Sequence, residues 1–301
     1  MRLGIRRISV KFALLLAAAA VVPLLAYGFI SLMSLERGTR QTVIEGNLNV
    51  AIRAAEEIRR YVATNADLLK VLSADLQDTG LTQAQQDRLL KNYVLQVREF
   101  REITLFDEAR NIIATSRVGK PRVEIPAKSG LDINGVSMSP IRVDEDLLPT
   151  ANFALHMTRL NQPSGWLVGE FSLEEMWRMV DRIRIGESGY AMVIAPDGEL
   201  VAHGDPDKKA LVAQATNMSS YPLVAASQAA RTDTPVSLEY TDDDSRSNLG
   251  VAARIPSLGW TVIVEQPTSE AYATATELRR QLTASISIAL LGMIAVDHQA
   301  G

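Results

Sequence analysis

Residues 186–203 read GESGYAMVIAPDGELVAH, and this stretch predicts a β-hairpin. Two short strand-like segments with apolar centres, at 190–194 and 199–203, flank the turn Ala195-Pro196-Asp197-Gly198. Proline presets φ for the second position of a turn, and glycine accepts positive φ without strain. Apolar runs joined by such a turn are typical of paired antiparallel strands. We therefore expect an antiparallel sheet to be built around this hairpin.

The chain on either side of the hairpin shows the same order of elements twice. After the hairpin we expect a helical stretch with turns at 207–231 and strands at 236–240, 248–254 and 260–266. Before it, a hairpin at 103–116 and an irregular stretch at 119–135 precede strands at 136–143, 152–160 and 166–171. The period of two in these segments is that of strands.

A repeated Gly-Trp pair begins the last strand of each half. Gly165-Trp166 and Gly259-Trp260 are 94 residues apart, and each strand runs into a helix-capping residue, Ser172 in the first half and Thr268 or Ser269 in the second. In the first half, Ser172-Leu173-Glu174-Glu175 predicts a capping box and a helix to 183. The fold class is α+β, with two tandem five-stranded antiparallel units at 101–184 and 185–267.

A long helical segment is expected to precede the first unit, at 34–100. Apolar residues recur at steps of four and three from Ile44 to Leu76, and this heptad spacing is interrupted at Asn65. A lone polar residue in such a stripe usually fixes the register of a paired helix, so the stripe predicts a homodimer through this helix. The alternative is that the stripe packs on the protein's own sheet, which is compatible with a dimer through the other face of the helix. Gly80 and Thr82 interrupt the helix, which is expected to resume at 83–100.

The first of two uncharged apolar stretches predicts a transmembrane helix. Residues 12–33 form 22 uncharged positions, and about 20 apolar residues span a bilayer core. Arg2, Arg6, Arg7 and Lys11 precede this stretch with no acidic residue, which places residues 1–11 in the cytoplasm. A cleaved signal peptide is the competing interpretation, but its apolar core is normally shorter and ends at a small-x-small site.

The second apolar stretch, Leu282 to Val296, has 15 residues and is short for a membrane span. We expect residues 268–301 to form a helix that returns to the membrane, in a chain that is a fragment of a longer protein. The alternative is a buried amphipathic C-terminal helix. On the first interpretation the protein lies in the plasma (inner) membrane, with residues 34–282 extracytoplasmic or periplasmic.

Composition narrows the chemistry that this chain can perform. A formal net charge of −4 does not attract the negatively charged phosphate backbone of a nucleic acid. No nucleic-acid partner is therefore expected. The absence of cysteine excludes thiolate nucleophiles and thiolate metal sites, and the three histidines are too scattered to suggest a metal cluster. We expect neither a metal nor a cofactor. Asp242-Asp243-Asp244 could attract a cation, but polar neighbours favour a solvated hairpin tip.

The order of helix and two sheet units between apolar ends resembles the double Cache (dCache) extracytoplasmic sensor domain of bacterial receptors. The resemblance covers about 34–282, and it depends on 103–116, on the Val136-Ser137-Met138-Ser139-Pro140 strand, and on 186–201 with its G-x-S-G-Y and D-G-x-L-V patterns. It implies two PAS-like units, in which the membrane-distal one binds a small ligand and the proximal one passes the change to the returning helix. Members that sense amino acids carry a tyrosine, arginine, tryptophan, tyrosine run where this chain has 128–135, so amino-acid specificity does not carry over.

Polar residues near strand ends of the first unit are the candidate ligand-binding residues. They are Arg117, Ser137, Ser139, Arg142, Asn152 and His156. An arginine can hold a carboxylate through two parallel hydrogen bonds, so Arg117 or Arg142 would suit a small polar or anionic metabolite. Alternation in its strand favours a solvated face for His156. His203 is expected to cap its strand or to face water.

Two functions from different classes fit these patterns. The first is a sensing module whose ligand shifts the membrane helices and controls a cytoplasmic kinase, cyclase or methyl-accepting domain. The second is a membrane-anchored binding or scaffold protein without signalling output. An extracytoplasmic hydrolase is a more distant third, because the chain contains no nucleophile elbow, phosphate-binding glycine loop or helix with paired histidines.

Overall fold

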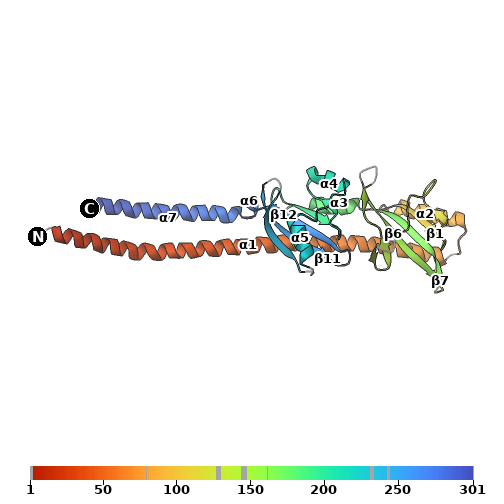
Figure 1. Ribbon diagram of the computed structural model, residues 1–301, viewed down its shortest axis with the longest axis horizontal. Coiled ribbons are helices and arrows are strands. Elements are labelled where there is room, and N and C mark those ends of the chain that lie inside the picture. The colour runs from red at the N-terminus through yellow and green to blue at the C-terminus, as the bar shows by residue number, and fades with distance from the viewer. Residues whose placement is uncertain are drawn as a thin grey trace.

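The computed structural model describes residues 3–78, 80–126, 130–143, 148–160, 162–230, 234–242 and 245–300. Most side chains before residue 25 and after 288 lie outside this description. The molecule is elongated, with a long helix, α1 (Leu3–Asp78), that runs behind two sheet units. Both chain ends lie at the same end of the molecule, where α1 and the last helix, α7 (Ala273–Ala300), run side by side (Figure 1).

A shorter helix, α2 (Gln83–Gln96), follows α1 and turns the chain into the first sheet. Its start is fixed by Thr82, whose backbone N–H donates to the side-chain oxygen of Gln85 at 2.9 Å. The helix ends at Gln96 and not at residue 100, since Phe100 already belongs to the first strand. The predicted helix 83–100 is therefore four residues too long.

The first sheet contains the seven strands β1 to β7, of which β5 pairs only with β6. The order of the remaining strands across the sheet is β2-β1-β7-β6-β4-β3, and all pairs are antiparallel. Their bounds are β1 Phe100–Phe106, β2 Ile112–Thr115, β3 Leu131–Ile133, β4 Val136–Met138, β5 Arg142–Val143, β6 Pro149–Arg159 and β7 Gln162–Ser172.

The second sheet contains five strands in the order β10-β11-β12-β8-β9. The helix α3 (Glu174–Arg182) connects it to the first sheet, and three short helices lie between β9 and β10. The bounds are β8 Tyr190–Ile194, β9 Leu200–His203, β10 Val236–Thr241, β11 Ser247–Ile255 and β12 Trp260–Pro267, with η1 Pro206–Lys208, α4 Lys209–Ala213, α5 Pro222–Ala229 and α6 Thr268–Ala271 as helices. Strands β2-β1-β7-β6-β4 of the first sheet thus recur as β9-β8-β12-β11-β10.

The apolar stripe of α1 packs inside the molecule. Residues from Ala51 to Leu76 on this stripe are at most 6% exposed, and they form one core cluster with the inner faces of both sheets. Asn65 is also buried, and its side-chain nitrogen donates to the backbone oxygen of Tyr61 at 2.7 Å, within the same helix. The predicted dimer seam along this stripe is wrong, because helical spacing alone does not distinguish a sheet from a second helix as the covering surface.

Three local predictions need correction. The single strand expected at 136–143 is broken into β4 and β5, because Pro140 lacks the N–H that a continuous ladder needs. Within the stretch expected to be irregular, β3 adds to the edge of the first sheet. Before α3 the helix-capping position is Leu173, and Ser172 Oγ accepts from the Glu174 N–H at 3.3 Å, so the predicted capping box is not formed.

Both ends of the chain are helical, as expected, and their described apolar side chains are exposed. Phe29 and Ile30 in α1 and Ile288 and Leu291 in α7 are 64–70% exposed. Among the residues described with side chains, no helical stretch is long and apolar enough to cross a membrane. The predicted span at 12–33 and the apolar stretch at 282–296 both fall partly outside those residues.

Candidate functional site

The face of the first sheet that points away from α1 carries most of the predicted polar residues. Residues paired across strands share a face, and the pairs Ser137 with Ala154 and His156 with Trp166 place those side chains on this one. A small apolar cluster of Phe106, Val123, Ala154 and Val168 covers part of it, and Val123 comes from the loop after β2. The loop thus folds over the sheet and leaves space beside it.

That space is a cavity of about 480 Å³. Its lining comes from the β1–β2 turn, the covering loop, the β4–β5 segment, β6 and β7, namely Arg110, Glu124, Ile125, Pro126, Gly130, Ser139, Pro140, Arg142, Asn152 and Trp166. This size is in the range of pockets that hold a small organic molecule. The two arginine side chains have no hydrogen-bond or ion-pair partner within the described part of the chain, so their charge is available to a ligand.

Ser139 and Asn152 hold the strand edge that forms one wall of the cavity. Ser139 Oγ accepts from the Asn152 backbone N–H at 2.9 Å and donates to the Pro140 carbonyl at 2.9 Å. The side-chain nitrogen of Asn152 donates to the Glu124 carbonyl at 3.4 Å, which ties the covering loop to β6. These contacts fix the backbone where the sequence breaks the strand, and they orient the two polar side chains toward the cavity wall.

Arg117 does not line the cavity. Its Nη1 lies 3.5 Å from Oε2 of Glu102, whose side chain is 1% exposed. The same carboxylate accepts the backbone N–H of Arg122 at 3.0 and 3.2 Å and the Thr104 hydroxyl at 3.2 Å. A buried carboxylate requires such partners. The arrangement assigns Arg117 to neutralising Glu102 and anchoring the covering loop.

The remaining two predicted residues also lie outside the lining. Ser137 is on the same face of the sheet, two residues before Ser139. The His156 ring stacks on Trp166 at 4.4 Å between centroids, and its Nε2 lies 3.0 Å from Oε1 of Glu108. Its side chain is 39% exposed, which agrees with the solvated face expected for it. Of the six candidates, the structure brings Ser139, Arg142 and Asn152 together.

Arg110 and Trp166 are two cavity residues with side chains suited to a ligand that the sequence did not indicate as site residues. Arg110 occupies the left-handed position of the β1–β2 turn, with φ 66°, and the sequence shows only a polar turn there. In the sequence Trp166 belongs to the repeated Gly-Trp pair, and it is not among the predicted ligand-binding residues. No local signal in the sequence identifies either residue, because they meet only through the pairing of β1 with β7, in which Phe106 lies opposite Trp166.

Two other expectations fall partly outside the described residues. In the stretch 128–135, where the amino-acid-sensing pattern is absent, residues 128 and 129 are not described, and Leu131 to Ile133 form β3. In the acidic stretch at 242–244, only Asp242 is described. Its carboxylate accepts the backbone and Nε protons of Arg246 and the side-chain amide of Asn248, at 2.7–3.1 Å, and these hydrogen bonds stabilise the tip of the β10–β11 hairpin.

Comparison with known families agrees with this arrangement. Residues 35–275 match the family model described as the Cache domain. The chain belongs to the Cache domain family. The match to the Cache domain begins within α1, at residue 35, and includes both sheets. It ends at residue 275, just after the start of α7.

Related proteins of known type are bacterial receptors. The chain is 24% identical over 140 residues to the methyl-accepting chemotaxis protein PctB of Pseudomonas aeruginosa, covering 45% of this chain and 20% of that receptor. The chain therefore spans about a fifth of that relative's length.

Solved structures share the fold. The ligand-binding domain of the Campylobacter jejuni chemoreceptor Tlp3 with L-norvaline has a TM-score of 0.60 at 12% identity, covering 78% of this chain and 94% of that one. The ligand-binding domain of the Pseudomonas fluorescens chemoreceptor CtaA with L-isoleucine has a TM-score of 0.59 at 17% identity, covering 79% and 98%. Domains of this family are sensory and not catalytic. The relatives therefore do not support the hypothesis of an extracytoplasmic hydrolase.

Proposed function

We propose that this chain is the extracytoplasmic, small-molecule-sensing part of a bacterial transmembrane signal-transduction receptor. Its membership of the Cache family and its likeness to chemoreceptor ligand-binding domains support a sensing role. Residues 101–184 form the membrane-distal unit of this receptor and residues 185–267 the membrane-proximal one. The output domain is a cytoplasmic methyl-accepting, kinase or cyclase domain beyond the present chain.

The ligand binds in the cavity of the first sheet, and it is a small molecule with a carboxylate. The observation that carries this proposal is the pair of arginines, Arg110 and Arg142, that line the cavity without partners among the described residues. A guanidinium forms charge-assisted hydrogen bonds to a carboxylate that are about twice as strong as neutral ones. Trp166 supplies an apolar wall, and Asn152 can fix the orientation of a second polar group.

The two end helices cross the inner membrane in this proposal. The basic residues before residue 12 favour a cytoplasmic N-terminus, and the described apolar side chains of α1 and α7 near the ends are exposed, as in lipid-facing helices. A ligand then acts by its different affinities for two arrangements of these helices, an effect of typically 1–3 kcal/mol. Reporter fusions at Gly204 should behave as extracytoplasmic, and cytoplasmic activity there would contradict this topology.

The binding proposal is tested on the full chain in lipid nanodiscs. A thermal-shift screen of mono- and dicarboxylates and amino acids identifies hits, and calorimetry measures their dissociation constants. Arg142→Gln and Arg110→Gln should each weaken a hit roughly 10- to 100-fold, because each removes a charge-assisted hydrogen bond. Arg178→Gln, at an exposed arginine on α3 that pairs with Glu174, is the matched control and should leave binding unchanged.

If a hit binds Arg142→Gln and Arg110→Gln with the same dissociation constant as the wild type, this cavity is not the binding site. A membrane-anchored binding protein without output is distinguished by a different observation. If the parent gene ends shortly after residue 301 and ligand binding leaves the spacing of α1 and α7 unchanged, the signalling part of the proposal is wrong while the binding part stands.

A further inference from the structure

The second sheet repeats the corner at which the first sheet forms its cavity. In the β1–β2 turn, the Asp107 N–H donates to the Asn111 carbonyl at 2.9 Å, and in the β8–β9 turn the Ala195 N–H donates to the Glu199 carbonyl at 2.8 Å. Both turns have five residues, and their fourth residue has positive φ, Arg110 in one and Gly198 in the other. Both hairpins also carry a bulge one residue before the turn.

Strand pairing extends this equivalence to the last strand of each sheet. The final residue of β1 pairs with Trp166, and the final residue of β8, Ile194, pairs with Thr261. On the other side, Trp166 pairs with His156 and Thr261 pairs with Arg254. Thr261 and Arg254 therefore occupy the positions of Trp166 and His156. A large stacked ring pair in the first sheet is replaced by a small hydroxyl and a cation in the second.

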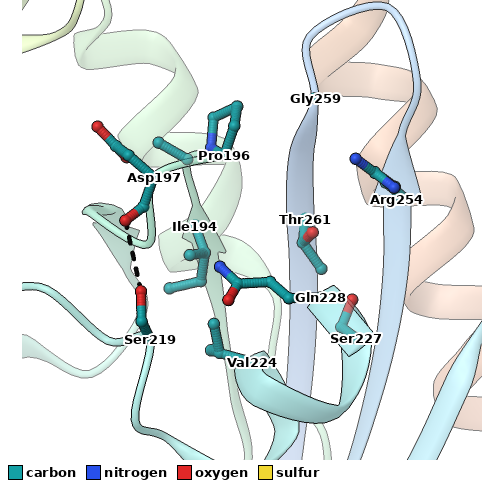
Figure 2. A pocket seen from close by; sticks show the side chains of 11 residues that line it. Ile194, Pro196, Asp197, Ser219, Val224, Ser227, Gln228, Arg254, Gly259 and Thr261 are labelled. Carbon is teal, nitrogen blue, oxygen red and sulfur yellow. Dashed lines mark hydrogen bonds between the residues drawn. The ribbon is translucent and has the colours of Figure 1, made fainter. Parts of the chain in front are cut away.

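A cavity of about 330 Å³ lies at this corner of the second sheet (Figure 2). Its floor is apolar, because Ile194 and Val224 are at most 2% exposed and belong to the core between the sheet and α5. Ser227 and Gln228 project from α5, with the Gln228 amide reaching toward Ile194 on β8, and Arg254 stands on β11 beside Thr261 of β12 (Figure 2). The cavity thus combines an apolar floor with hydroxyl, amide and guanidinium groups.

The charge balance of this cavity is positive. Arg254 is exposed, and within the described residues its guanidinium has no hydrogen-bond or ion-pair partner. The one carboxylate in the lining, Asp197, accepts the Glu199 N–H at 3.1 Å and points away from the cavity in Figure 2. Ser219 is occupied by the Asp197 carbonyl, to which its hydroxyl donates at 3.4 Å. A ligand therefore meets one free cation and uncharged polar groups.

We infer that this cavity of the second sheet is a second ligand site, for a short aliphatic 2-hydroxycarboxylate. The carboxylate pairs with Arg254, the hydroxyl hydrogen-bonds to Ser227 or Gln228, and the aliphatic part lies on Ile194 and Val224. The volume suits a molecule of this size and not a peptide. The site is separate from the cavity lined by Arg110 and Arg142, so it goes beyond the function proposed above.

Calorimetry on the full chain in nanodiscs tests this assignment with three matched probes. These are 2-hydroxy-3-methylbutanoate, 3-methylbutanoate without the hydroxyl, and the neutral 2-hydroxy-3-methylbutanamide. The hydroxy acid should bind best, and the amide should bind roughly 10- to 100-fold more weakly. Arg254→Gln should abolish the preference for the acid over the amide, and Ser227→Ala should reduce the preference for the hydroxy acid over 3-methylbutanoate.

The distal double variant Arg110→Gln/Arg142→Gln separates this site from the distal cavity, which also takes carboxylates. In this variant the preference for the hydroxy acid over the amide should persist and should still depend on Arg254, whereas its complete loss would place the site in the first sheet and overturn the inference. Equal affinity of the wild type and Arg254→Gln, or no heat from the hydroxy acid at millimolar concentration, would also overturn it. Arg254→Lys guards against misfolding, since it keeps the charge and should keep the preference for acid over amide.

Discussion

His203, at the end of β9, is buried and not solvated. It is 6% exposed, its ring lies 4.8 Å from the ring of Tyr190, and its Nδ1 accepts the Asp205 N–H at 3.0 Å. Burial, which disfavours the charged form, lowers the pKa of His203 to about 4. Of the two expected roles, capping is confirmed by the hydrogen bond from Asp205, whereas exposure to water is wrong, because the short helices after β9 cover this strand end.

The lowered pKa of His203 predicts a loss of stability in mild acid. The unfolded state binds a proton near pH 6.5 and the folded state only near pH 4, so the free energy of unfolding falls as the pH drops through this window. The His203 contribution to this fall is roughly 2 kcal/mol between pH 7 and pH 5. Urea unfolding of the wild type and His203→Gln at both pH values measures it. Identical pH dependence of the two proteins would contradict the assignment.

Arg117 is expected to matter for stability and not for ligand binding. Removing it deprives the buried Glu102 carboxylate of its cationic partner and, among the described residues, leaves it the Arg122 N–H and the Thr104 hydroxyl. Arg117→Met should lower the free energy of unfolding by roughly 1–3 kcal/mol, and Glu102→Gln in the same background should restore part of it. Denaturant unfolding measures both changes. A ligand affinity that falls tenfold in Arg117→Met would instead place this arginine in the binding site.

At the scale of elements, the two faces of α1 have different roles. One face, from Ala51 to Leu76, is buried in the core against both sheets. On the other face, Ile52 and Val71 are 45% and 55% exposed. A helix in a solvated protein usually carries charged or polar residues on such a face. If this protein is a homodimer through α1, the outer face is the one that remains available to the partner.

Engineered cysteines distinguish the two faces, because the chain has none of its own. We expect Ile52→Cys and Val71→Cys to form disulfide-linked dimers upon oxidation in membranes, since equivalent positions on two parallel helices come within disulfide reach near a two-fold axis. Ala55→Cys, at 6% exposure, should stay monomeric on a non-reducing gel. Crosslinking at Ala55 but not at Ile52 or Val71 would mean that the seam along the inner face exists after all.

At the scale of the whole molecule, three distant segments meet where α1 and α7 leave the second sheet. Glu239 on β10 accepts from Arg40 Nε on α1 at 2.8 Å and from the hydroxyl of Tyr272, which immediately precedes α7. The hydrogen bond from Tyr272 and the pairing with Arg40 lower the pKa of Glu239, so it stays ionised. This carboxylate links the sheet to both end helices and suits a role in passing displacement between them.

Removing the charge of Glu239 should loosen the helix pair with little loss of stability. Exposed ion pairs contribute about 0–1 kcal/mol, so Glu239→Gln should lower Tm by less than about 4 °C. Spin labels at residues 37 and 281 should show a broader distance distribution between α1 and α7. Glu56→Gln, which removes a pair confined to α1, is the control and should not broaden it. An unchanged distribution in Glu239→Gln would exclude a coupling role.

The sequence by itself determined the fold class and the order of the long helix and of most strands, although it missed β3 and the break between β4 and β5. Turn residues at 195–198 and apolar alternation at 190–194 are local signals, and they located β8 and its hairpin to within one residue. The repeated Gly-Trp pair is also a local signal, and it indicated the last strand of each sheet. Local chemistry also predicted the long helix before the first sheet and the helical ends.

Only the tertiary structure decided which surfaces meet. The stripe of α1 has the spacing of a coiled coil, but the sheets cover it, and spacing carries no information about the covering surface. Arg117 and Arg142 look alike in sequence, yet one neutralises Glu102 and the other lines a cavity without a partner among the described residues. The cavity itself is formed by residues 110, 142 and 166, which pairing between non-consecutive strands brings together, and such long-range pairing leaves no mark in any single stretch of the chain.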